Sequence, residues 1–148
     1  MSGFMADAAM PAASAVVVQV ANVRNSRGRV HVALCPHEKF LSHTCAIEGS
    51  APAHPGVTTI TLEGVPPGDY AAQAFHDEND NHKVDQGIFG IPKEGVGFSR
   101  DARIAFGPPK WADAVITHGD SRQTIHLTLR YFMGPGGPDA WARSERPR

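Results

Sequence analysis

Short stretches in which apolar residues alternate with polar ones recur along this chain, and they constrain its fold class more than any other feature. A period of two places every second side chain on one face of a β-strand, and β-branched residues favour that conformation. The stretches with this pattern are 16–21, 30–34, 57–63, 70–76, 114–117 and 123–131. With no convincing long helix between them, they predict an all-β sandwich or barrel, of which we favour a single antiparallel β-sandwich.

The segments between these strands carry turn residues. Residues 25–28 (NSRG) have the composition of a turn, so the strands on either side are predicted to pair as a hairpin with its apolar face inward. Residues 64–68 (GVPPG) predict a rigid turn, because each proline fixes φ and glycine accepts unusual dihedral angles. Scattered prolines and glycines predict a long connection with one helical turn over residues 36–55.

The segment from Asp77 to Asp113 has little periodicity but holds several large aromatic residues: Phe89, Phe98, Phe106 and Trp111. Burial of apolar area stabilises a fold by roughly 25 cal/mol per Å², so these rings are too large to leave in water. We therefore expect a long ordered loop with short irregular or helical turns, packed on one end of the sandwich. Long loops in compact domains are often functional, which makes this segment the expected place for a binding site.

Length and charge limit the domain organisation and the partners. The 148 residues suit one domain, expected at 15–132, after a disordered end or signal-peptide remnant at 1–14 and before a disordered tail at 133–148. A net charge of −1 without a basic stripe argues against a nucleic-acid partner. No apolar run approaches the roughly 20 residues of a transmembrane helix.

Cys35 and Cys45 are the only cysteines. An exported domain permits a disulfide between them, whereas the cytosol keeps both reduced, and the sequence does not show whether their Cα atoms are close enough. The first residues lack the basic start and continuous apolar stretch of an intact signal peptide. We expect a periplasmic or secreted protein, with a cytoplasmic location as the alternative.

Residues 77–85 (DENDNHKVD) contain the most specific local pattern. Side-chain oxygens of Asp77, Asn79, Asn81 and Asp85 fall at positions 1, 3, 5 and 9 of an oxygen-ligand loop, with the carbonyl of Lys83 at position 7. Calcium takes six to eight oxygen ligands, so the spacing predicts a calcium site. The loop departs from the usual pattern because position 6 is not glycine and position 12 is not glutamate. A metal-free turn, in which these side chains cap their own backbone, is the alternative.

Two other kinds of site remain open on the sequence. His76, His82 and Asp85 could ligate zinc or another transition metal, although their spacing fits no strong template. Acids of the long loop, Asp77, Asp85 and Glu94 above all, could converge as the acid and base of a hydrolase. That hypothesis predicts a concave pocket in which at least two of them meet.

The run FHDENDNHKVDQGIFGIPKEGVGFS at 75–99, followed by FGPPKWADA at 106–114, resembles a bacterial family catalogued as domain of unknown function 2141. The upstream LEGVPPGDY at 62–70 is similar to the same family and to transthyretin-like sandwiches more widely. The resemblance covers roughly residues 16–131. It implies a β-sandwich of the prealbumin or immunoglobulin type, usually exported, and it implies no established activity.

These observations favour a non-catalytic extracytoplasmic binding or structural module, stabilised by calcium at the Asp77–Asp85 loop. The ligand could be a protein, a glycan or a small molecule, and the residues do not select among them or indicate an oligomeric state. The alternative is a metal-assisted or carboxylate-based hydrolase that uses the Asp77–Asp113 loop.

Overall fold

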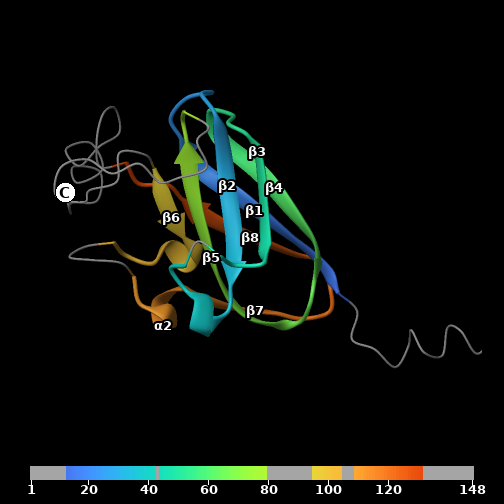
Figure 1. The fold of residues 1–148 in the computed structure, drawn as a ribbon. Coiled ribbons are helices and arrows are strands. Elements are labelled where there is room, and N and C mark those ends of the chain that lie inside the picture. Colours follow the sequence, from blue (N-terminus) through green and yellow to red (C-terminus); the bar gives the residue numbers. More distant parts are fainter. Residues whose placement is uncertain (1–12, 43, 80–94, 105–108, 132–148) are drawn as a thin grey trace, which may run out of the picture.

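Two β-sheets pack face to face in the computed structural model, which confirms the predicted β-sandwich (Figure 1). The structure describes residues 13–42, 44–79, 95–104 and 109–131. The three-stranded sheet has the order β4-β1-β8 and consists of β4 (Gly56–Val65), β1 (Ser14–Val23) and β8 (Gln123–Thr128). The five-stranded sheet has the order β3-β2-β5-β6, with β7 also paired to β5, and consists of β3 (Ile47–Pro52), β2 (Arg29–Cys35), β5 (Gly68–Asp77), β6 (Val96–Phe98) and β7 (Val115–His118).

The core lies between the two sheets and is made by the alternating positions that the sequence indicated. Val16, Val18 and Val20 of β1 are fully buried. They share one cluster with the inward-facing residues of the other strands, which include Val30, Val32, Leu34, Ile60, Leu62, Leu127, Leu129 and Tyr131. Burial of each such side chain stabilises the fold by about 1.5–3 kcal/mol, so this layer is what holds the two sheets together.

The predicted hairpin between the first two strands is wrong. β1 pairs with β4 and with β8, whereas β2 pairs with β3 and β5. A hairpin within one sheet and an arch between two sheets require the same period-two pattern, because both turn every second side chain toward the core. Residues 24–28 therefore cross from one sheet to the other. The pair β1–β8 is also parallel, so one strand pair departs from the antiparallel arrangement that we predicted.

The GVPPG segment also joins strands of different sheets, β4 and β5. Gly64 has φ of +64°, a value that disfavours any side chain. After the turn, the Tyr70 hydroxyl donates a hydrogen bond to the carbonyl of Pro66 at 2.8 Å. Burial raises the pKa of Tyr70. The arrangement resembles the tyrosine corner of other β-sandwiches, in which a tyrosine fastens a sheet-to-sheet connection.

The connection over residues 36–55 holds more structure than predicted. The expected helical turn is η1 (His37–Lys39), but β3 was missed. β3 is an edge strand with the sequence IEGSAP, and it lacks the valine-rich alternation that marks the other strands. Cys35 and Cys45 form a disulfide with a Cα–Cα distance of 5.3 Å, which closes the loop between β2 and β3.

A second, smaller cluster covers part of the outer face of the five-stranded sheet. Its centre is Ala71 of β5, with η3 (Ser99–Asp101) and α2 (Trp111–Ala114) packed on it. Trp111 stacks on His37 at 4.7 Å, and Phe40 contacts the rings of both Trp111 and Phe98. The sequence predicted short helical turns in this part of the chain, with Phe98 and Trp111 packed on the sandwich. The turns η3 and α2 and the packing of both rings agree with these predictions.

The hydroxyl of Ser99 fixes this cluster to the sheet. Ser99 is fully buried, accepts a hydrogen bond from the backbone of Ala72 at 2.9 Å and donates one to the carbonyl of Ala114 at 2.5 Å. The other two predicted aromatic anchors, Phe89 and Phe106, lie outside the described residues. Among the described residues, no helix combines the length and the hydropathy of a membrane span.

Replacing Trp111 with alanine should lower the free energy of unfolding by about 2–3 kcal/mol, because a large ring packed on two neighbours is lost. The measurement is urea unfolding followed by circular dichroism. Val57→Ala is the control: Val57 is 49% exposed on β4, and its truncation should change stability by less than about 0.5 kcal/mol. Equal effects of the two changes would show that the Trp111 cluster contributes no packing.

Candidate functional site

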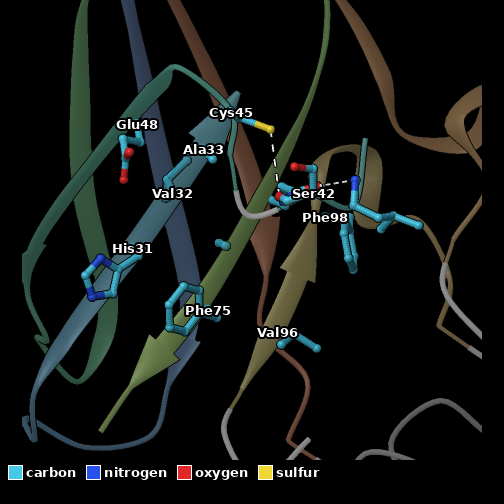
Figure 2. Close-up of a pocket in the computed structure, with 12 residues that line it drawn as sticks. His31, Val32, Ala33, Ser42, Cys45, Glu48, Phe75, Val96 and Phe98 are labelled. Atoms are coloured by element: carbon cyan, nitrogen blue, oxygen red, sulfur yellow. Dashed lines mark hydrogen bonds between the residues drawn. The ribbon is translucent and has the colours of Figure 1, made fainter. Parts of the chain in front are cut away.

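A pocket of about 230 Å³ lies on the outer face of the five-stranded sheet, beside the Trp111 cluster (Figure 2). Its floor includes His31 and Ala33 of β2 and Phe75 of β5. Phe98 and Val96 of β6 lie on one side, and the loop closed by the disulfide supplies Leu41 and Ser42. This volume is below the roughly 300–1,000 Å³ of sites for drug-sized molecules, so it suits a group about the size of one side chain.

Strand register explains why these residues meet. β2 turns Val30, Val32 and Leu34 inward, so its alternate positions point outward. His31 pairs with Phe75, and Phe75 pairs with Val96, which makes one row across three strands. The next row is Ala33, Gln73 and Phe98. The small side chain of Ala33 leaves the hollow between larger neighbours.

His31 is held in place by two contacts. Its ring stacks on Phe75 with centroids 4.8 Å apart and an interplanar angle of 16°. Its Nε2 lies 3.2 Å from Oδ2 of Asp77, whose side chain is fully buried. Neighbouring side chains cover most of the ring, whose side-chain exposure is 16%.

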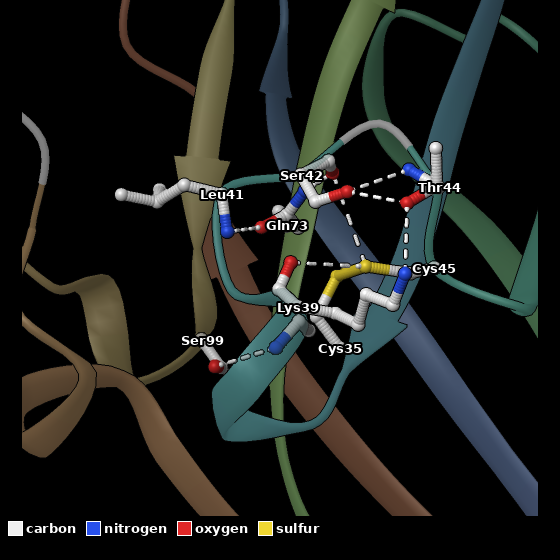
Figure 3. Close-up of a disulfide and its surroundings, with 9 residues drawn as sticks. Cys35, Lys39, Leu41, Ser42, Thr44, Cys45, Gln73 and Ser99 are labelled. Atoms are coloured by element: carbon white, nitrogen blue, oxygen red, sulfur yellow. Dashed lines mark hydrogen bonds between the residues drawn. A yellow bond between two sulfur atoms is a disulfide. The ribbon is translucent and has the colours of Figure 1, made fainter.

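The loop wall is clamped by one side chain of the sheet. Gln73 accepts a hydrogen bond from the backbone N–H of Leu41 and donates one to the carbonyl of Ser42, both at 2.9 Å (Figure 3). Leu41 has φ of +71°, a conformation that costs a non-glycine residue about 1–2 kcal/mol. Its side chain is 39% exposed. The loop is therefore held in a strained conformation that presents an apolar side chain at the pocket, and such strain recurs at binding sites.

One carboxylate stands at the pocket. Glu48 is exposed on β3, opposite Ala33 in the strand register, and Figure 2 places it on the same side of the pocket as His31. The described lining residues include no lysine or arginine, and Glu48 forms no ion pair with any described residue. Among these residues, the pocket therefore combines apolar and aromatic walls with the negative charge of Glu48.

The predicted calcium loop begins where β5 ends. Asp77 is the last residue of β5, and Asn79 lies exposed in the turn that follows. Asn81, Lys83 and Asp85 lie outside the described residues, so the calcium site stays a prediction. A cation bound there would have to share Asp77 with His31. In the part of the chain that the structure describes, no three His, Cys, Asp or Glu side chains are grouped to hold a metal ion.

Glu78, the second residue of that loop, is bound by residues of the crossing between β1 and β2. Nε and Nη2 of Arg24 donate to its two carboxylate oxygens at 2.8 Å, and Asn25 donates at 2.7 Å. These hydrogen bonds, above all those from Arg24, lower the pKa of Glu78 to about 2. The group ties the crossing between β1 and β2 to the end of β5. Gly28 in that crossing has φ of +67° and lies against the backbone of Asp77, where a side chain would collide.

His76 is not available as a ligand for the predicted transition-metal site. This residue is fully buried, with Nδ1 2.9 Å from the Tyr131 hydroxyl and Nε2 2.7 Å from the carbonyl of Arg27. A carbonyl only accepts, so Nε2 carries a hydrogen, and both ring nitrogens are engaged. The Tyr131 hydroxyl also accepts the backbone N–H of Arg24, and burial raises its pKa to about 12. His76 is thus part of a structural network.

The acids of the hydrolase alternative do not meet within the described ranges. Asp77 contacts His31, Asp101 accepts the backbone N–H of Thr128 at 2.8 Å, and Asp113 is exposed in α2. Asp85 and Glu94 lie outside the described residues, so this alternative also stays a prediction.

A serine–histidine pair was missed by sequence reasoning. Ser14 Oγ lies 3.0 Å from Nε2 of His118, and Nδ1 of His118 lies 2.8 Å from the Gln123 side-chain oxygen. The order serine, histidine, orienting acceptor matches that of acyl-transfer enzymes. None of the three residues lines the pocket described above. His118 is 1% exposed, and the contacts join the starts of β1 and β8 to β7, which is a structural role.

The comparisons with known proteins identify a family and no activity. A family model described as "Uncharacterized protein conserved in bacteria (DUF2141)" matches residues 18–126. Neither curated proteins nor solved structures give a significant match to the chain.

Replacing Gln73 with alanine should loosen the pocket wall, because both hydrogen bonds that clamp the loop are lost. Amide hydrogen exchange at Leu41 should accelerate about tenfold or more, while exchange at Val32 in the core should change far less. Gln19→Ala, on the outer face of the other sheet, is the matched control. Unchanged exchange at Leu41 would contradict the clamp.

Replacing Glu78 with glutamine should lower the free energy of unfolding at pH 7 by about 1–3 kcal/mol, because a charged hydrogen-bonding partner of Arg24 is lost. The pKa of Glu78 is below its ordinary 4.5, so its contribution is present above pH 4.5 and disappears as pH falls toward 2. Urea unfolding between pH 7 and pH 2.5 should show the two proteins converging. Glu63→Gln, on exposed β4, should show no such convergence.

Proposed function

We propose, from the premise that the chain belongs to the DUF2141 family of bacterial proteins, that it is a non-catalytic extracytoplasmic binding domain whose ligand occupies the pocket on the outer face of the five-stranded sheet. The observation that carries the proposal is the pocket wall. A loop closed by a disulfide and clamped by Gln73 holds Leu41 in a strained backbone conformation at the pocket. Strain of this kind persists only where surrounding contacts enforce it.

The location follows from the same loop. The Cys35–Cys45 disulfide is consistent with an oxidising compartment outside the cytoplasm. A periplasmic or secreted protein fits this chemistry, and the disulfide then contributes directly to the binding site, because Cys45 lines the pocket.

The chemistry of the lining supports binding over catalysis. The side-chain amide of Gln73 forms hydrogen bonds with the backbone of the loop, and the Ser42 hydroxyl lies 2.6 Å from that of Thr44. These groups are therefore occupied in shaping the wall. Apolar walls with few convergent polar groups are typical of small-molecule sites. The size of the pocket favours a small molecule, or one side chain of a larger partner, over a glycan.

A fragment screen read by two-dimensional NMR tests this function. Hits should shift the amide signals of β2, β5 and the disulfide loop, and they should lose affinity in Ala33→Leu, which fills the floor without entering the core. Ala21→Leu, an outward position of β1 in the other sheet, should leave binding unchanged. Hits that map elsewhere, or that bind Ala33→Leu equally well, would remove the pocket as the site.

A further inference from the structure

We infer that this pocket selects a cation, namely an ammonium group on an aromatic or aliphatic stem, with Glu48 as its counter-charge. The inference rests on the proposed binding function and adds the chemical class of the ligand. It is carried by the charge pattern of the described lining residues: Glu48 is an exposed carboxylate, no lysine or arginine is among them, and aromatic rings lie on the floor and on the far side.

Among the described polar groups of the pocket, Glu48 is the charged group that remains available. Gln73 uses its oxygen and its nitrogen on the disulfide loop. Nε2 of His31 is directed at Asp77, which is fully buried. Glu48 forms no ion pair within the described ranges and is exposed to solvent beside the pocket. A ligand seated on Phe75 would therefore meet Glu48 as its charged neighbour.

An anionic ligand fits this charge pattern poorly. Its charge would lie near Glu48, with no lysine or arginine among the described lining residues to compensate. The nearest basic residue along β2 is Arg29, whose Nε donates to the Ser50 hydroxyl at 3.1 Å. A neutral ligand would gain apolar contact only, and Glu48 would stay hydrated and unused.

A cation gains from two sources. An ammonium attracts a carboxylate, and this attraction is stronger beside an apolar wall than in open water. The faces of aromatic rings also attract cations. His31 and Phe75 form a stacked pair, and Phe98 lies on the opposite side of the pocket in Figure 2. These rings, with Leu41, supply the surface on which an apolar stem would pack.

The volume sets the size of the occupant. About 230 Å³ holds one ring with a short chain, and phenethylamine has this form. A molecule this small should bind with a Kd on the order of 1 mM. The lysine side chain has the same ammonium on an aliphatic stem, so a protein partner could present the same chemistry.

The test compares three probes of nearly equal shape: phenethylamine, 2-phenylethanol and phenylacetate. NMR titration of the folded, oxidised protein at pH 7 and low salt gives a Kd for each. We expect phenethylamine to bind about two- to fivefold more tightly than 2-phenylethanol, with phenylacetate the weakest. The preference should shrink at 0.5 M salt, because salt screens an exposed charge pair.

Glu48→Gln should abolish the preference for the amine while leaving 2-phenylethanol binding unchanged. Glu63→Gln, which removes an exposed carboxylate from β4 of the other sheet, should leave the preference intact. N-acetyl-lysine methylamide, titrated in parallel, shows whether a lysine side chain can supply the ammonium. A Glu48-dependent preference supports the inference with either stem.

The outcomes separate this inference from the proposed function. Equal binding of amine and alcohol in the pocket, or an amine preference that survives Glu48→Gln, overturns the charge selection and leaves the binding pocket standing. If none of the probes and none of the screened fragments shifts the pocket signals, both the pocket function and the inference fail.

Discussion

Strand β5 is packed on both of its faces, and this constraint governs the rest of the structure. Its inward residues Tyr70, Ala72 and Ala74 belong to the core between the sheets. Its outward residues carry the Trp111 cluster at one end, through Ala71, and the pocket floor toward the other, through Phe75. A strand covered on both faces cannot move without disturbing the core, so both outer features rest on a rigid base.

The composition of β5 reflects this double packing. Ala71, Ala72 and Ala74 are all buried, and small side chains let neighbouring elements approach closely. η3 and α2 use that closeness through Ser99, which bonds to backbone groups on both β5 and α2. Where a larger outward residue appears, at Gln73, it reaches across to the disulfide loop. The same strand therefore sets the position of both walls of the pocket.

The period-two pattern correctly predicted which strand residues are buried, but it did not predict which strands pair in space. Val16, Val18 and Val20 were correctly placed in a core, because an apolar face must be buried whichever strands become neighbours. The predicted hairpin between the first two strands was wrong because a period of two does not specify which strands pair with each other. The disulfide was left open for a related reason, since only the folded loop brings two Cα atoms to 5.3 Å.

The pocket could not be predicted, because its residues occupy the outward positions that a strand pattern treats as solvent-facing. His31, Glu48 and Phe75 come from three strands, and they meet only through registers that the sequence does not state. The one local signal was a bulky aromatic residue, Phe75, at an outward position of β5. Such a ring needs a cover, and here His31 and the neighbouring strands provide it in part.

Two groups of polar side chains near β5 differ in whether they have bonding partners within the fold. This difference separates structural polar groups from available ones. At the Asp77 end, Glu78, Arg24, His76 and Tyr131 are bonded to one another or to the backbone, and these polar groups fix the crossing between the sheets. On the edge strand β3, Glu48 forms no ion pair with any described residue. The proposed binding surface therefore lies on the outer face of the sheet, where a carboxylate without an ion pair among the described residues stands beside a strained loop and a pair of stacked rings.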